Sequence, residues 1–191
     1  MKRANSPRKT EQEPAAVLSS EQVADATKEI TDTNREDHPL VETLQRQLSN
    51  LIILFVNYKH YHWQVAGPAF RDHHLMFDEF AAETEESFDE IAERIRMIGQ
   101  VPVFTINEIQ SRASVQSADR SLRMQDMIEE GDRNLIVLIR ELRQASKAAE
   151  EADDPGTVDL LGKVVRAAEK QEWYLRELLK EGKSSTIRAR A

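Results

Sequence analysis

The stretch that decides the fold is residues 58–99, which read YKHYHWQVAGPAFRDHHLMFDEFAAETEESFDEIAERIRMIG. Apolar residues recur every three or four positions on both sides of Gly67-Pro68, which is the spacing of one face of an α-helix. A glycine–proline pair interrupts a helix, because proline lacks the amide hydrogen and restricts the residue before it. The stretch therefore predicts two amphipathic helices joined by a tight turn.

The same period continues outward from this hairpin. Helices are expected at about 40–66, 69–98, 120–152 and 157–181, and glycine or proline separates them. Each is far longer than the ~12-residue average helix. The link over about 99–120 is long enough to cross the bundle and has room for a short helix over 105–111. We predict an all-α four-helix bundle with this crossover between its second and third helices, and Asp153-Asp154 capping the fourth.

The composition excludes several function classes. The 191 residues contain no cysteine, which excludes a disulfide scaffold, a cysteine-bound metal and thiol catalysis, and suits a reducing cytoplasm. The net charge of −8 would repel nucleic acid, so DNA affinity requires a local basic patch. No apolar run approaches the ~20 residues of a membrane span, and the N-terminus lacks the apolar stretch of a secretory signal. We expect a cytoplasmic protein without a membrane partner.

Three regions are expected along the chain. Residues 1–35 form a polar extension in which 1–18 are expected to be mobile and 19–30 are a candidate amphipathic helix packed on the body. Residues 36–182 form the bundle, and 183–191 are expected to be a mobile basic tail.

Both ends of the chain are basic arms on an acidic body. Many weak arms on a multisubunit assembly can bind DNA by avidity; the alternative is an ordinary solvated tail. The candidate DNA-binding residues are Lys2, Arg3, Arg8, Lys9, Lys183, Arg188 and Arg190.

Four of the five histidines fall between residues 60 and 74, at the junction of the first two helices. His62 follows Tyr58 by four positions, so it continues the apolar stripe and points inward or toward an interface, with His60 on roughly the opposite side. On the second helix, four potential ligands share one stripe about 100° wide beside the apolar face. They are His74, Asp78, Asp89 and Glu93.

Carboxylates at the edge of an apolar face are poorly solvated unless a cation binds them. Lys59 and Arg71 lie near the histidines, and either is a candidate to pair with these carboxylates when metal is absent. The alternative interpretation is that the histidines and carboxylates are ordinary surface residues.

The reach of a helix constrains any shared site. A hairpin turning at residues 67–68 brings His62 level with His74 and Asp78, whereas Asp89 and Glu93 lie ~22 Å further along the same helix. Metal–ligand bonds are only ~2 Å long. A two-fold dimer in which this helix packs antiparallel against its own copy brings the two groups together and generates two equivalent sites. Mixed imidazole and carboxylate ligands suit iron(II), manganese or zinc, and the excess of carboxylates favours iron.

The spacing His–x11–His–x3–Asp–x10–Asp–x3–Glu, together with the HWQVAGPAF stretch at residues 62–70, resembles the signature of the Dps family, the ferritin-like DNA-binding proteins from starved cells. The resemblance covers about residues 40–182 in helix layout. It implies a ferritin-like fold and a hollow dodecamer built from two-fold dimers.

The resemblance also implies a function. A Dps protein is a ferroxidase that oxidises iron(II), preferably with hydrogen peroxide, between subunits, and it stores ferric mineral and so protects DNA. The implied iron ligands are His62, His74, Asp78, Asp89 and Glu93, and Trp63 is a candidate electron donor.

Two alternatives share the helical-bundle fold. A classical ferritin site needs Glu-x-x-His, and none of the five histidines has a glutamate three residues before it. The other is a non-catalytic, nucleoid-compacting DNA-binding protein on the same fold, which would be nucleoid-associated.

Overall fold

The computed structural model describes residues 18–31, 39–119 and 123–188, and every regular element within these ranges is a helix. The chain divides into two compact units, residues 1–32 and 33–191. The first unit contains α1. The helices are α1 (Ser20–Thr31), α2 (Val41–Gln64), α3 (Phe70–Met97), α4 (Ile106–Arg112), α5 (Met124–Glu151) and α6 (Pro155–Arg188).

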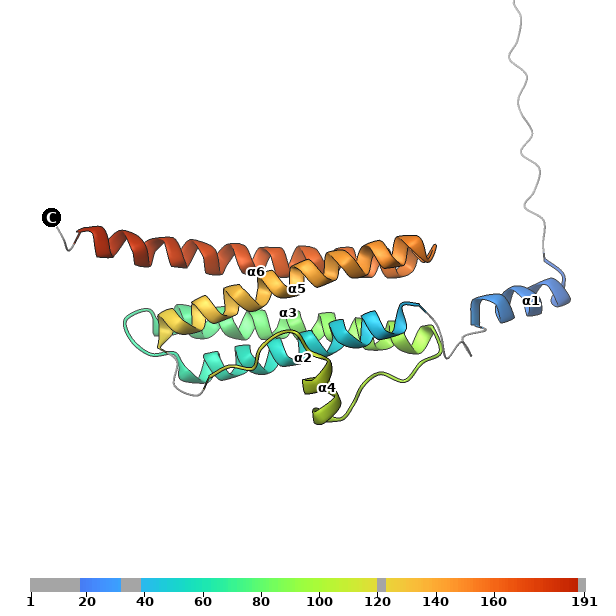
Figure 1. Ribbon diagram of the computed structural model, residues 1–191, viewed down its shortest axis with the longest axis horizontal. Coiled ribbons are helices and arrows are strands. Elements are labelled where there is room, and N and C mark those ends of the chain that lie inside the picture. Colours follow the sequence, from blue (N-terminus) through green and yellow to red (C-terminus); the bar gives the residue numbers. More distant parts are fainter. Residues whose placement is uncertain (1–17, 32–38, 120–122, 189–191) are drawn as a thin grey trace, which may run out of the picture. The chain divides into compact units, whose positions relative to one another are not determined.

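The second unit is built from two helical hairpins. Helices α2 and α3 pack along each other, as do α5 and α6, and the hairpins meet through contacts of α2 with α5 and of α3 with α6. Figure 1 shows the pair α5 and α6 lying over the pair α2 and α3. The segment between α3 and α5 carries the short helix α4, which contacts α2. The predicted four-helix bundle with a crossover is confirmed.

The core lies where the four apolar stripes meet. Leu48, Phe77, Ile91 and Leu138 come from three different helices, and each is almost completely buried. A Cβ atom added at Gly131 would lie 2.9 Å from Leu175 Cδ1, so the glycine in the stripe of α5 permits close approach of α6.

Buried amide side chains on α2 hold the crossover in place. Asn50 Oδ1 accepts hydrogen bonds from the backbone amides of Ser114 and Val115, at 2.7 and 3.1 Å. Asn57 Nδ2 donates to the Gln116 carbonyl at 2.7 Å. A buried amide must be hydrogen-bonded to be tolerated, so these contacts specify where the long link crosses α2.

The turn into α6 is fixed by Asp154. Its carboxylate accepts from the Thr157 amide at 2.9 Å, which caps the helix that Pro155 begins, and it accepts two hydrogen bonds from Arg94 Nη2 at 2.7 and 2.8 Å. Burial alone would raise the pKa of Asp154, but the hydrogen bonds from Arg94 and Thr157 outweigh it and hold that pKa below its ordinary value. The predicted cap therefore also ties α3 to α6.

The ends of the chain differ in part from expectation. Helix α1 occupies nearly the predicted 19–30, and its expected packing on the body stays a prediction. Residues 1–18 are expected to be mobile, and residues 1–17 of this segment lie outside the described residues. The last helix continues to Arg188 rather than ending at 182, because one glycine, Gly182, costs a helix only about 1 kcal/mol.

Within the described ranges, no helix combines the length and the apolar character that crossing a membrane requires.

We expect Asp154→Ala to lower the free energy of unfolding by about 1–2 kcal/mol, because it removes a helix cap and the partner of Arg94. The folded pKa of Asp154 is lowered, so this stabilisation is complete above the unfolded value of ~3.9 and is lost as the pH falls through the folded value. The urea midpoint of both proteins should therefore converge in acid. Asp159→Ala, on the exposed face of the same helix, is the control, and an equal loss there would contradict the cap.

Candidate metal centre

The turn between α2 and α3 brings His62 and His74 into contact. Their rings stack with centroids 3.7 Å apart and planes 21° from parallel. His62 Nδ1 lies 2.9 Å from the carbonyl oxygen of His74, and His74 Nδ1 lies 2.9 Å from the carbonyl oxygen of His62. The predicted level arrangement of the two histidines is thus observed.

This reciprocal pairing sets the chemistry of both rings. A carbonyl oxygen only accepts, so each Nδ1 must carry a proton, and in the neutral tautomer of such a ring the lone pair is on Nε2. A histidine oriented in this way by a backbone carbonyl presents Nε2 as a metal ligand. The two half-buried rings are therefore held in a form suited to coordination.

Asp78 lies beside the histidines on α3. Its Oδ1 is 3.8 Å from His62 Nδ1 and 2.7 Å from Lys59 Nζ, with the Asp78 side chain 51% exposed. The hydrogen bond from Lys59 holds the pKa of this carboxyl below its ordinary value. The sequence predicts that either Lys59 or Arg71 pairs with these carboxylates. Lys59 forms the ion pair with Asp78, and Arg71 lies on the exposed surface.

Asp89 and Glu93 lie on the same helix and are both exposed. Helix α3 is continuous over 28 residues, so the ~22 Å expected between the two groups of ligands is kept. Within the described part of one chain, no three histidine or acidic side chains are close enough to hold a metal ion together. One chain stacks His62 on His74, places Asp78 Oδ1 3.8 Å from His62 Nδ1, and leaves Asp89 and Glu93 apart from them.

Two further predictions have different outcomes. The Trp63 side chain is 68% exposed, and no aromatic ring of the described residues stacks on it. Four of the basic-arm residues, Lys2, Arg3, Arg8 and Lys9, lie outside the described residues, as does Arg190. Helix α6 contains the backbone of Lys183 and Arg188.

Sequence reasoning missed a buried phenol behind the histidines. Tyr61 is fully buried, and its hydroxyl donates to Glu130 Oε1 on α5 at 2.5 Å. Burial, the hydrogen bond to Glu130 and the negative charge of Glu130 raise the pKa of Tyr61 far above its ordinary value. The stripe phase of α2 indicates that a residue faces inward, but it does not identify a hydrogen-bond partner on another helix.

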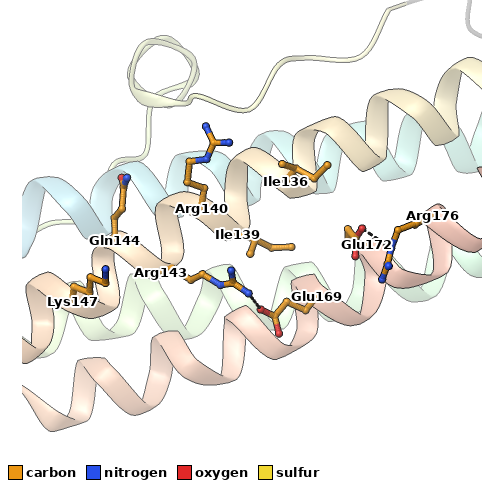
Figure 2. Close-up of a pocket in the computed structure, with 9 residues that line it drawn as sticks. All are labelled: Ile136, Ile139, Arg140, Arg143, Gln144, Lys147, Glu169, Glu172 and Arg176. Carbon is orange, nitrogen blue, oxygen red and sulfur yellow. Dashed lines mark hydrogen bonds and ion pairs between the residues drawn. The ribbon is translucent and has the colours of Figure 1, made fainter.

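A charged groove of the described surface lies elsewhere. It occupies about 720 Å³ between α5 and α6, and Figure 2 shows it lined by charged side chains, including the pairs Arg143–Glu169 and Arg176–Glu172, at 2.5 and 2.9 Å. None of the predicted metal ligands lines it. The predicted metal ligands therefore lie on the α2–α3 surface rather than in this groove.

Comparison with known proteins agrees with the fold and with the resemblance to the Dps family. Residues 41–185 match the ferritin-like domain. DNA protection during starvation protein 2 of Bacillus anthracis is 34% identical over 142 residues, covering 74% of this chain and 97% of that protein. Dps from Thermosynechococcus elongatus is 36% identical with a TM-score of 0.73, covering 78% and 95% of the two chains.

A more distant structure adds the chemistry of the superfamily. The Dps protein of Vibrio cholerae, described as a member of a broad superfamily of ferritin-like diiron-carboxylate proteins, is 26% identical with a TM-score of 0.70. The alignment covers 73% of this chain and 88% of that one.

We expect Lys59→Met to increase the affinity of the assembled protein for zinc(II), because no ammonium then competes for Asp78. The pair is partly exposed, so the gain should be about two- to fivefold, equivalent to ~1 kcal/mol or less. Calorimetric titration measures it, since zinc(II) binds without being oxidised. Lys170→Met is the matched control, because Lys170 on α6 pairs with Glu83, which lies on α3 as Asp78 does. This variant should leave the affinity unchanged. Equal affinity in the Lys59 variant would contradict the competition.

Proposed function

The chain belongs to the Dps family of ferritin-like proteins, and we propose that it is a ferroxidase whose centres form between two subunits related by a two-fold axis. Iron(II) is the substrate, hydrogen peroxide the preferred oxidant, and the ferric product is stored in a hollow dodecamer. Removing both reactants suppresses hydroxyl-radical formation and so protects DNA.

The observation that carries this proposal is the separation of the ligands on one rigid helix. His62, His74 and Asp78 cluster at one end of α3, while Asp89 and Glu93 project ~22 Å away and are exposed. An antiparallel copy of α3, centred near residues 83–84, would bring the partner's second group to the first. The same operation generates a second, equivalent centre.

Each ligand has a chemical role in this proposal. Asp89 and Glu93 of one subunit bind iron directly, since carboxylates are hard ligands that suit its ferric state. His62 of the other subunit contributes Nε2, and His74 and Asp78 bind a second iron directly or through water. Peroxide takes one electron from each of two iron(II) ions, and its O–O bond breaks to give two hydroxides.

Complementation between two inactive variants tests the shared site. One variant carries His62→Ala with His74→Ala, and the other carries Asp89→Ala with Glu93→Ala; neither alone should oxidise iron(II). Refolding an equal mixture should restore about a quarter of the parental rate, because half of the dimers are mixed and each of these has one intact centre. Peroxide-driven iron(II) oxidation is followed by absorbance.

A centre formed within one chain predicts no restoration, which would end the proposal. The control for charge removal is Glu79→Ala with Glu85→Ala, two exposed carboxylates on the same helix, and this variant should oxidise iron(II) at the parental rate.

The basic arms carry the DNA-binding part of the proposal. The relatives are named for DNA protection, and this chain places Lys2, Arg3, Arg8 and Lys9 in its first nine residues without an acid. Repeated on every subunit of a shell, such arms would bind DNA by avidity and associate the protein with the nucleoid in the cytoplasm. The alternative, a non-catalytic DNA-compacting protein, shares the arms and lacks the iron chemistry.

Removing residues 1–18 and changing Lys183, Arg188 and Arg190 to alanine should abolish DNA shifts and leave iron oxidation intact. Binding by the parent should weaken steeply as salt rises, because each phosphate contact releases counterions. Electrophoretic mobility at several salt concentrations measures both effects. DNA binding that survives the change would assign it to the body.

A further inference from the structure

The buried pair Tyr61 and Glu130 has no role in the proposed iron ligation. Tyr61 on α2 donates its hydroxyl hydrogen to Glu130 Oε1 on α5 at 2.5 Å, the short distance of a charge-assisted hydrogen bond. The Tyr61 ring packs against Phe77, with centroids 5.2 Å apart, and against Tyr58 at 6.3 Å. The phenol is therefore inside the bundle, away from solvent, with a carboxylate as its only described hydrogen-bond acceptor.

Tyr61 is attached to the same helix segments as the histidine group. Tyr61 immediately precedes His62, and Phe77, on which its ring packs, immediately precedes Asp78. Neighbouring Cα atoms are ~3.8 Å apart, so Tyr61 and its contact Phe77 are attached to the ligand-bearing segments of both α2 and α3, whereas Trp63 adjoins His62 on α2 alone.

The acceptor distinguishes Tyr61 from the other oxidisable side chains nearby. A phenol that loses an electron becomes a strong acid, so its oxidation is favourable only where a base takes the proton at hydrogen-bond distance. Glu130 supplies a carboxylate. Tyr58 is equally buried, but its hydroxyl donates to the amide oxygen of Gln171 at 2.9 Å, and an amide is not a base at neutral pH. Trp63 is 68% exposed and is open to solvent.

We propose that Tyr61 donates one electron to hydrogen peroxide when a single iron(II) ion occupies the centre, while its phenolic proton moves to Glu130 Oε1. This inference rests on the proposed ferroxidase function.

The step balances. Iron(II) gives one electron and becomes iron(III), Tyr61 gives the second and becomes a neutral tyrosyl radical, and the O–O bond breaks to give two hydroxides. A second iron(II) ion then reduces the radical, and Glu130 returns the proton. The net reaction remains two iron(II) ions for each peroxide, and no hydroxyl radical leaves a half-filled centre.

The test uses the assembled full-length protein. One iron(II) per centre is mixed with one equivalent of hydrogen peroxide, and the sample is freeze-quenched for electron paramagnetic resonance. The parent should give a tyrosyl radical, and Tyr61→Phe should lose it. Glu130→Gln keeps an acceptor oxygen but removes the base, so it should also lose the radical. Tyr58→Phe is the matched control, a second buried tyrosine, and should keep it.

A second readout follows the hydroxyl radicals that escape. With one iron(II) per centre, spin-trapped hydroxyl radical should rise in Tyr61→Phe above the parent, and with two per centre the two proteins should match. Size-exclusion chromatography checks that the variants assemble. If Tyr61→Phe fails to assemble, Glu130→Gln provides the test.

Four results would overturn the inference. A parent that oxidises iron(II) without a tyrosyl radical, or a radical that persists in Tyr61→Phe, excludes Tyr61 and leaves the ferroxidase function standing. An indole radical that Trp63→Phe abolishes assigns the donor to Trp63. A parent that oxidises no iron(II) with two ions per centre overturns the proposed function and this inference together.

Discussion

The rise of a straight α-helix is the constraint on which the proposed metal chemistry depends. Helix α3 carries two sets of potential ligands on one stripe, and its unbroken hydrogen-bonded backbone keeps them ~22 Å apart. No side-chain rotation closes such a gap, because metal–ligand bonds are about tenfold shorter. Incompleteness of the single chain is therefore built into its secondary structure, and it couples the proposed chemistry to assembly.

The contacts around the histidines give the predicted ligands His62, His74 and Asp78 partners within one chain. The two rings fix each other's orientation through backbone carbonyls, and Lys59 neutralises Asp78. The Asp78 side chain is 51% exposed, so water and Lys59 both solvate its carboxylate, and a metal ion would compete with Lys59 for the same oxygen. Asp78 and the two histidines thus have partners in the free chain and are also the residues proposed to bind iron.

The buried polar side chains of the bundle differ in what they bond: some bond the backbone of the crossover, and one bonds a carboxylate. Asn50 Oδ1 and both polar groups of Asn57 hydrogen-bond the backbone of the crossover, which is a structural use. Tyr61 instead donates its hydroxyl hydrogen to the carboxylate of Glu130, a group that can take up a proton. Two tyrosines three residues apart, equally buried, thereby differ in chemistry because different helices provide their acceptors.

The sequence by itself determined the four long helices, the crossover with α4 and the alignment of His62, His74 and Asp78, because these follow from local periodicity, from glycine and proline, and from fixed helix geometry. It misplaced the end of α6, since one glycine weakens a helix without stopping it. Only the tertiary structure decided that Lys59 rather than Arg71 pairs with Asp78, that the two histidine rings stack, and that Tyr61 meets Glu130. These contacts join residues from different helices, and their partners are fixed by how the helices pack, which no pattern within a single helix encodes.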